Sequence, residues 1–93
     1  MIFIINKLKY DTENMELVST KCKHYYTSLL IAPIRHTGKN VKLFKSKKGN
    51  WLLTYETDYQ NCAIALSEEK AQEYLLQYDY TAYEKYFGTL EEA

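Results

Sequence analysis

The order of its periodic segments constrains the fold of this 93-residue chain more than any other feature. The first two thirds contain short runs of alternating or β-branched residues, typical of strands, and the last third has helical periodicity. Strands are expected at residues 2–5, 8–10, 15–20 and 27–34, and in a hairpin over residues 41–55. Strands followed by helices are typical of an α+β domain. We therefore expect a single domain over residues 1–93, an antiparallel β-sheet of hairpins followed by one or two C-terminal helices packed on one face.

Turn-forming residues separate the first strands. Asn6 and Lys7 provide a two-residue turn between residues 2–5 and 8–10. Pro33 lacks the N–H that a ladder needs. The strand over residues 27–34 is therefore expected to lie at an edge or to end at Pro33.

The hairpin over residues 41–55 is the clearest unit. Its connection, Lys47-Lys48-Gly49, fits a type I turn followed by glycine in the left-handed region. Counting outward from this turn pairs Lys45 with Trp51 and Val41 with Tyr55. One face is then a core face with a cation–π contact between Lys45 and Trp51, and it carries Val41, Leu43, Trp51, Leu53 and Tyr55. The other face is expected to be neither fully solvated nor fully buried, and it carries Lys42, Phe44, Ser46, Asn50, Leu52 and Thr54.

Two helices are expected after residue 66. Ser67 is a suitable N-cap, and two glutamates follow it where the helix dipole favours anions. An apolar stripe at helical spacing supports this first helix and consists of Ala71, Tyr74, Leu75 and Tyr78. A capping box from Thr81 to Glu84 predicts a second short helix, which Gly88 is placed to end.

The formal net charge of zero conceals two strongly charged halves. Residues 1–55 contain ten Lys and Arg against three acids, a net charge of +7. Residues 56–93 contain two lysines against nine acids, a net charge of −7. A division of this kind bears on partners and association rather than on the fold.

Each charged half has two interpretations. The stretch from Arg35 to Lys48 contains no acid, and aromatic residues lie near it in the sequence, as on a surface that binds phosphates and stacks bases. Lysines on edge strands also protect a sheet against edge-to-edge pairing without any ligand. The acidic helical end is either a solvated helix face or a set of carboxylates and tyrosines that a basic cleft of a nucleic-acid enzyme would bind.

No pattern indicates catalysis, a cofactor or a membrane span. The chain has three glycines, no glycine-rich phosphate loop and no segment of about 20 apolar residues. Cys22, His24, His36 and Cys62 can ligate zinc, but they lack the paired short spacings of structural zinc sites. We therefore expect neither an enzyme nor a metal protein. The start of the chain lacks the features of a signal peptide, so we expect reduced cysteines and a location in the host-cell cytoplasm.

Four segments carry a resemblance that covers most of the chain in order. They are Lys-Tyr-Asp-Thr-Glu at 9–13, Leu-Phe-Lys-Ser-Lys-Lys-Gly-Asn-Trp at 43–51, Leu-Ser-Glu-Glu-Lys-Ala at 66–71 and Tyr-Glu-Lys-Tyr-Phe-Gly at 83–88. Together they resemble a group of small uncharacterised proteins carried by phages and other mobile elements of Gram-positive bacteria. Residues 21–40 have no counterpart in this resemblance. It implies a mobile-element origin and an anti-defence role, such as inhibition of CRISPR effector complexes.

These observations predict a small phage-type protein that inhibits a host nucleic-acid-processing defence effector by stoichiometric binding. The alternative is a module that binds single-stranded nucleic acid through the basic aromatic hairpin, and a third hypothesis is a self-associating subunit. Tyrosine and tryptophan surrounded by charge are typical of binding hot spots. The residues predicted to contact a partner are Lys42, Phe44, Lys47, Lys48 and Trp51 of the hairpin, with Tyr80, Tyr83 and Glu84 as a second patch.

Overall fold

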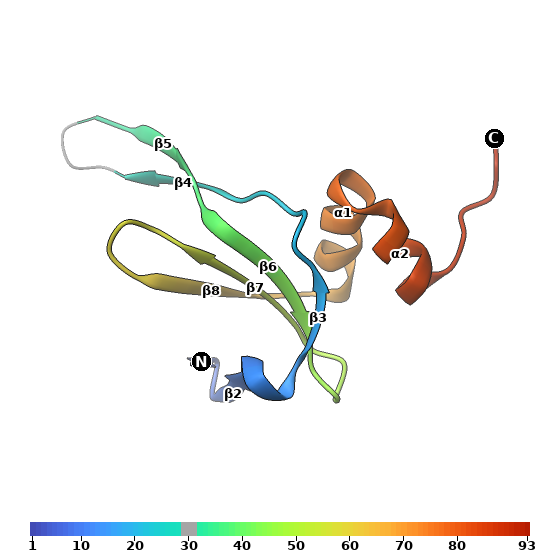
Figure 1. The fold of residues 1–93 in the computed structure, drawn as a ribbon, viewed down its shortest axis with the longest axis horizontal. Coiled ribbons are helices and arrows are strands. Elements are labelled where there is room, and N and C mark those ends of the chain that lie inside the picture. The colour runs from blue at the N-terminus through green and yellow to red at the C-terminus, as the bar shows by residue number, and fades with distance from the viewer. Residues whose placement is uncertain (29–31) are drawn as a thin grey trace.

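The computed structural model describes residues 1–28 and 32–93, in which eight strands precede two helices (Figure 1). The strands are β1 (Ile2–Ile5), β2 (Leu8–Asp11), β3 (Glu16–Ser19), β4 (Tyr25–Ser28), β5 (Ile34–Thr37), β6 (Lys39–Lys45), β7 (Trp51–Glu56) and β8 (Asn61–Leu66). The helices are α1 (Glu68–Tyr78) and α2 (Tyr80–Phe87), and a 3₁₀ turn (Thr12–Asn14) precedes β3. The order of strands and helices confirms the predicted α+β class.

The strands form three antiparallel sheets. A four-stranded sheet has the order β3-β6-β7-β8, while β1-β2 and β4-β5 are separate two-stranded ribbons. The turn between β1 and β2 holds Asn6 and Lys7 at φ values of 51° and 64°. Positive φ at both central residues is what a tight hairpin turn requires, so the predicted two-residue turn is confirmed.

The single strand predicted over residues 27–34 is wrong. Two antiparallel strands, β4 and β5, replace it, and Tyr25 pairs with Thr37 at one end and Ser28 with Ile34 at the other. Part of the predicted strand, residues 29–31, lies outside the described residues. Pro33 immediately precedes β5, as expected of a residue that cannot donate to the ladder.

The predicted β6-β7 hairpin is confirmed from its turn as far as the pair of Lys42 with Thr54. Gly49 has a φ of 88°, and Lys45 pairs with Trp51 and Lys42 with Thr54. Beyond this point the predicted pair of Val41 with Tyr55 is wrong, because the register shifts and Lys39 pairs with Glu56. The shift coincides with Asn40, whose φ of 49° marks a β-bulge that inserts one residue into β6.

The helices cover one face of the four-stranded sheet, as predicted. The buried cluster between them unites residues of the core face with residues of both helices: Cys22, Val41, Leu43, Trp51, Leu53, Ala71, Leu75, Ala82 and Tyr83. The predicted cation–π contact is present, with Lys45 Nζ at 5.4 Å from the Trp51 ring centroid.

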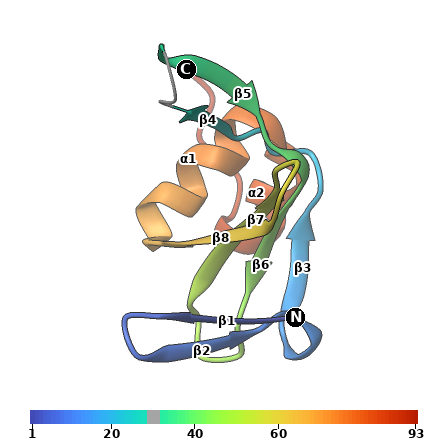
Figure 2. The same cartoon turned by 90° about the vertical axis from the view of Figure 1, so that its left-hand side faces the viewer.

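The opposite face of the sheet is also covered, by the β1-β2 ribbon (Figure 2). Phe44, Leu52 and Tyr10 are buried together there, and Phe3 and Ile5 of β1 pack against them. The expectation that this face is only half buried is therefore wrong for its apolar residues. The cause is that the sequence signals of residues 2–10 identify a hairpin but not the surface on which it folds.

One aspartate joins the helical layer to the sheet. The Asp79 N–H donates to the Leu75 carbonyl at the end of α1, and its side chain accepts from the Ala82 N–H at the start of α2. Asp79 Oδ2 also accepts a 2.6 Å hydrogen bond from the hydroxyl of Ser19, the last residue of β3. The predicted capping box at Thr81 is wrong, because α2 begins at Tyr80 with Asp79 as its N-cap. Ser67 and Gly88 cap the helices as predicted.

Candidate functional site

The eight residues predicted to bind a partner divide by burial. Three are core residues: Phe44 is 9% exposed, Trp51 is 2% exposed and Tyr83 is 7% exposed. The other five are exposed and are Lys42, Lys47, Lys48, Tyr80 and Glu84. Phe44, Trp51 and Tyr83 pack inside the monomer because both faces of the central hairpin are covered. These three aromatic side chains are therefore corrected from candidate contacts to core residues.

Few ion pairs join the two charged halves in the described residues. In residues 1–28 and 32–93 the structure contains two ion pairs, Lys39 with Asp58 and Lys70 with Glu73. Only the first of these joins the basic half to the acidic half. In the described residues, most charged side chains of one half thus form no ion pair with the other half.

We call the first candidate surface the acidic helical surface. It consists of the exposed carboxylates of α1 and α2, namely Glu68, Glu69, Glu73 and Glu84, together with Tyr80. The Tyr80 ring stacks on Tyr83 with centroids 5.8 Å apart. Its hydroxyl accepts a hydrogen bond from the Leu90 N–H at 3.3 Å, so the C-terminal segment is held against α2. The predicted second patch thus keeps two surface members, Tyr80 and Glu84.

The second candidate surface, the lysine depression, is lined by residues of the β6-β7 turn and of the segment from β2 to the 3₁₀ turn. Figure 2 shows the β6-β7 turn beside the β1-β2 ribbon. Lys9, Lys47 and Lys48 line a depression of about 420 Å³ there. Asp11 also lines it, but its two carboxylate oxygens accept from the Glu13 N–H and the Asn14 side chain. Sequence reasoning missed Lys9, because nothing local in residues 2–10 indicates that this ribbon approaches the β6-β7 turn.

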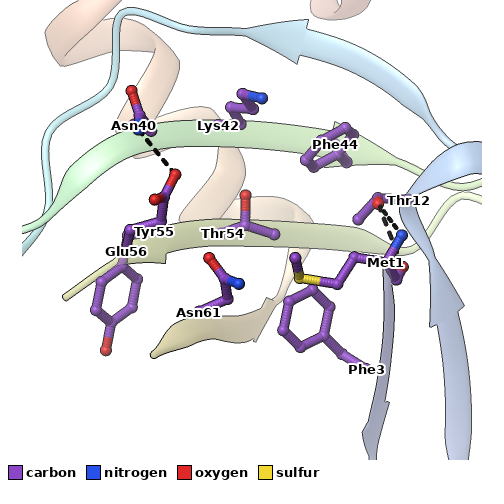
Figure 3. A pocket seen from close by; sticks show the side chains of 10 residues that line it. All are labelled: Met1, Phe3, Thr12, Asn40, Lys42, Phe44, Thr54, Tyr55, Glu56 and Asn61. Carbon is purple, nitrogen blue, oxygen red and sulfur yellow. Dashed lines mark hydrogen bonds between the residues drawn. The ribbon is translucent and has the colours of Figure 1, made fainter. Parts of the chain in front are cut away.

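Lys42 lines a different and smaller pocket (Figure 3). This pocket has a volume of about 110 Å³ and lies between β6, β7 and the N-terminal residues. Asn40 donates to Glu56 at 2.8 Å across it, and the terminal amine of Met1 donates to Thr12. Pockets that hold small organic ligands are typically about 300 Å³ or larger. The geometry therefore fits a few water molecules rather than a substrate or cofactor.

A stack of four rings attaches the β4-β5 ribbon to the sheet. The ring centroids of His24 and Tyr55 are 4.4 Å apart, those of Tyr55 and Tyr26 are 5.8 Å apart, and those of Tyr26 and His36 are 5.1 Å apart. Burial lowers the pKa of His24 below its ordinary value of 6.5. The His36 ring is fixed by Ser28, whose hydroxyl lies 2.9 Å from Nε2. These rings come from three strands and the segment before β4, so sequence spacing alone does not reveal the stack.

A tyrosine–glutamate contact joins α2 to β3. The Tyr86 hydroxyl donates to Glu16, and burial together with this hydrogen bond raises the pKa of Tyr86 to about 12. Lys45 lies over the same ring, 5.6 Å from its centroid. Tyr86 therefore serves the packing of the helical layer and stays protonated at neutral pH.

The zinc-capable residues do not converge. The described residues hold no group of three or more His, Cys, Asp or Glu side chains positioned to bind a metal ion. Cys22 and Cys62 are both free thiols. Burial raises the pKa of Cys22, with Ser19 as the neighbouring hydroxyl at 3.9 Å. A raised pKa reduces the thiolate population that nucleophilic or metal-binding chemistry needs.

Comparison with known proteins identifies no relative. No protein-family model matches the chain, and no curated protein or solved structure is significantly similar to it. Neither described helix is long and apolar enough to cross a membrane. Function must therefore be inferred from the residues of this chain.

Proposed function

We propose that this protein is a stoichiometric inhibitor that binds a nucleic-acid-processing defence effector of the host through its acidic helical surface. The observation that supports this proposal is the distribution of charge: α1 and α2 expose four glutamates against two lysines, Lys70 and Lys85, while the other lysines lie in the β part. Such a surface needs spaced negative charge and no catalytic geometry.

The chemistry of the partner follows from that surface. Enzymes that process nucleic acids bind phosphates in clefts rich in Lys and Arg, and complementary charge accelerates and orients association. Carboxylates in such a cleft occupy the places of phosphates. Tyr80 adds an aromatic contact of the kind enriched at hot spots. The resemblance to small phage and mobile-element proteins supports a host defence effector as the target of such an inhibitor.

The test measures target-DNA cleavage by a panel of purified CRISPR effector complexes from Gram-positive bacteria. Inhibition by this protein is expected to saturate at about one molecule per effector. The variant Glu69→Gln, Glu73→Gln, Glu84→Gln is expected to weaken inhibition about tenfold or more, because it removes three charges from the binding face.

A matched control removes three charges elsewhere. Glu13→Gln, Glu56→Gln, Asp58→Asn neutralises carboxylates outside the helices and is expected to inhibit like the parent protein. Equal loss in both variants would show that net charge, rather than this surface, is responsible. A pull-down from host lysate without a defence protein, together with unchanged phage plating, would contradict the proposal.

The alternative is a module that binds single-stranded nucleic acid, and the lysine depression is the observation that favours it. Lys9, Lys47 and Lys48 converge there from two separate hairpins. Phe44 and Trp51 are buried and do not supply stacking platforms. Binding through this surface would therefore use phosphate contacts and would be independent of base sequence.

Fluorescence anisotropy with a thymidine oligonucleotide of about 20 residues tests this alternative. Three phosphate contacts predict that affinity falls roughly twentyfold when salt rises from about 50 to about 200 mM, since about 0.7 counterions are released per contact. The variant Lys9→Gln, Lys47→Gln, Lys48→Gln is expected to lose most of this binding, whereas Lys21→Gln, Lys23→Gln, Lys70→Gln keeps it. Absence of binding at about 50 mM salt would remove the alternative.

A further inference from the structure

The last strand of the four-stranded sheet leaves one edge of that sheet unpaired by the strands that the structure describes. β8 pairs with β7 over six consecutive positions, from Trp51 with Leu66 to Glu56 with Asn61, without a register shift. Figure 2 shows β8 between α1 and the β1-β2 ribbon. Among the described strands, β8 is thus hydrogen-bonded to β7 on one side only, while α1 and β1 contact it from the two faces of the sheet.

This edge lacks the devices that usually prevent pairing between molecules. Exposed edges are commonly protected by charged residues, prolines, bulges or short strand length. The opposite edge, β3, has two of these features, because Glu16 lies in it and its register shifts between Leu17 and Ser19. β8 reads Asn-Cys-Ala-Ile-Ala-Leu and contains no charge, no proline and no bulge.

The hydrogen-bond pattern shows which residues point to the open side. The Thr57 N–H donates to the Gln60 carbonyl at 2.9 Å, so this pair is a hydrogen-bonded pair of the β7-β8 ladder. Such pairs alternate along an antiparallel ladder, so Cys62, Ile64 and Leu66 face β7. The N–H and C=O groups of the alternate residues, Asn61, Ala63 and Ala65, therefore point away from β7.

A second hairpin gives the same assignment independently. The Ser46 N–H donates to the Asn50 carbonyl at 2.8 Å, which makes Phe44–Leu52 and Lys42–Thr54 hydrogen-bonded pairs of the β6-β7 ladder. Leu52 and Thr54 thus face β6, and the intervening residues of β7 face β8, as the β7-β8 pattern requires.

We propose that β8 pairs antiparallel with β8 of a second copy of this chain, about a two-fold axis at Ala63. This register pairs Ala63 with its own counterpart and Asn61 with the counterpart of Ala65. All three outward-facing residues then form about six backbone hydrogen bonds. The pairing joins two four-stranded sheets into one continuous sheet.

We expect the strand that pairs with β8 to come from a second copy of this chain, because β8 is complementary to itself. A two-fold axis at Ala63 pairs Ala63 with its own counterpart, Cys62 with that of Ile64 and Asn61 with that of Ala65, so a charge in the strand would be desolvated without a partner of opposite sign. β8 carries none. The chain as a whole has a formal net charge of zero, so two copies do not repel one another at long range.

The acidic first turns of α1 in the two copies lie far from each other in this arrangement. The register brings each of them near the β7-β8 turn of the other copy, where Asp58 is paired with Lys39. Glu68 and Glu69 follow the Leu66 end of β8. In the antiparallel pair the two Leu66 ends lie about 20 Å apart, at about 3.4 Å per residue. Charges at that distance are screened at physiological ionic strength, where the Debye length is about 8 Å.

Sedimentation velocity over a range of protein concentrations tests the proposal. The parent protein is expected to shift from monomer to dimer as its concentration rises, with little change at high salt. Ala63→Pro removes an N–H that the β7 ladder does not use, so the monomer should keep its circular dichroism spectrum. Dimer affinity is expected to fall roughly thirtyfold, because two intermolecular hydrogen bonds are lost.

A control variant distinguishes this edge from the exposed apolar face of the β1-β2 ribbon. Ile4 is 67% exposed, and Ile4→Thr is expected to leave the dimer unchanged. A parent protein that stays monomeric at all concentrations, a dimer lost only in Ile4→Thr, or a dimer that dissociates with rising salt would overturn the proposal. If Ala63→Pro fails to fold, Ala65→Pro provides the same test at the next outward-facing N–H.

Discussion

Replacing Trp51 by alanine is expected to lower the free energy of unfolding by about 4 kcal/mol. Trp51 is 2% exposed and lies at the centre of the contact between the sheet and the helices. Its ring stacks on Phe87 with centroids 5.5 Å apart and meets the Tyr86 ring edge-on at 6.0 Å. Alanine leaves a cavity among these rings and removes the only tryptophan of the chain. Since a domain of this size is stable by about 5–15 kcal/mol, this loss takes a large share of its stability.

Urea denaturation followed by far-ultraviolet circular dichroism measures this change without relying on tryptophan fluorescence. Tyr59, which is 96% exposed, provides the control, and Tyr59→Ala is expected to change stability by less than about 0.5 kcal/mol. If Trp51→Ala kept the parent's stability but lost binding to a partner, Trp51 would be a contact residue and its assignment to the core would be wrong.

Replacing Asp79 by alanine is expected to cost about 3 kcal/mol of stability. The substitution removes the N-cap of α2, where Asp79 Oδ1 accepts from the Ala82 N–H at 3.3 Å. It also removes the acceptor of the buried Ser19 hydroxyl, which is 4% exposed. Two separate losses therefore add at one position, an uncapped helix and a buried hydroxyl without its carboxylate partner.

Thermal and urea unfolding of three variants measures the combined loss. Asp79→Asn keeps a capping side chain and an acceptor oxygen, so it should lose less stability than Asp79→Ala. Asp58→Ala removes an exposed ion pair with Lys39 and is expected to cost less than about 1 kcal/mol. Equal losses of stability in Asp79→Ala and Asp58→Ala would show that the hydrogen bonds of Asp79 contribute no more than an exposed ion pair.

Local signals in the sequence were sufficient for the parts of the fold that local interactions determine. The turn at Gly49 and the tight turn at Asn6-Lys7 require positive φ, and the structure has it at all three residues. The turn at Gly49 also sets the register of β6 and β7 as far as Lys42. Ser67 begins α1 because its hydroxyl accepts from the Lys70 N–H.

Contacts between segments distant in sequence could not be predicted in this way. The pattern of Phe44 and Leu52 identifies an apolar face, but not the ribbon that covers it. The bulge at Asn40 was not predicted either, because counting outward from the turn assumes an uninterrupted register. For the candidate surfaces, the four charged residues predicted to bind a partner are exposed, whereas three of the four aromatic contact residues proved to be buried.

The β4-β5 ribbon shares no ladder with the four-stranded sheet. In the described residues its attachment includes the stacked rings, the Tyr74 hydroxyl at 3.5 Å from His24 Nδ1, and a close approach at Gly38, where an added Cβ would lie 3.1 Å from Tyr55. Residues can therefore be inserted between β4 and β5 without breaking a hydrogen bond of the four-stranded sheet. For protein engineers this ribbon is therefore the natural place to graft a foreign peptide onto the scaffold.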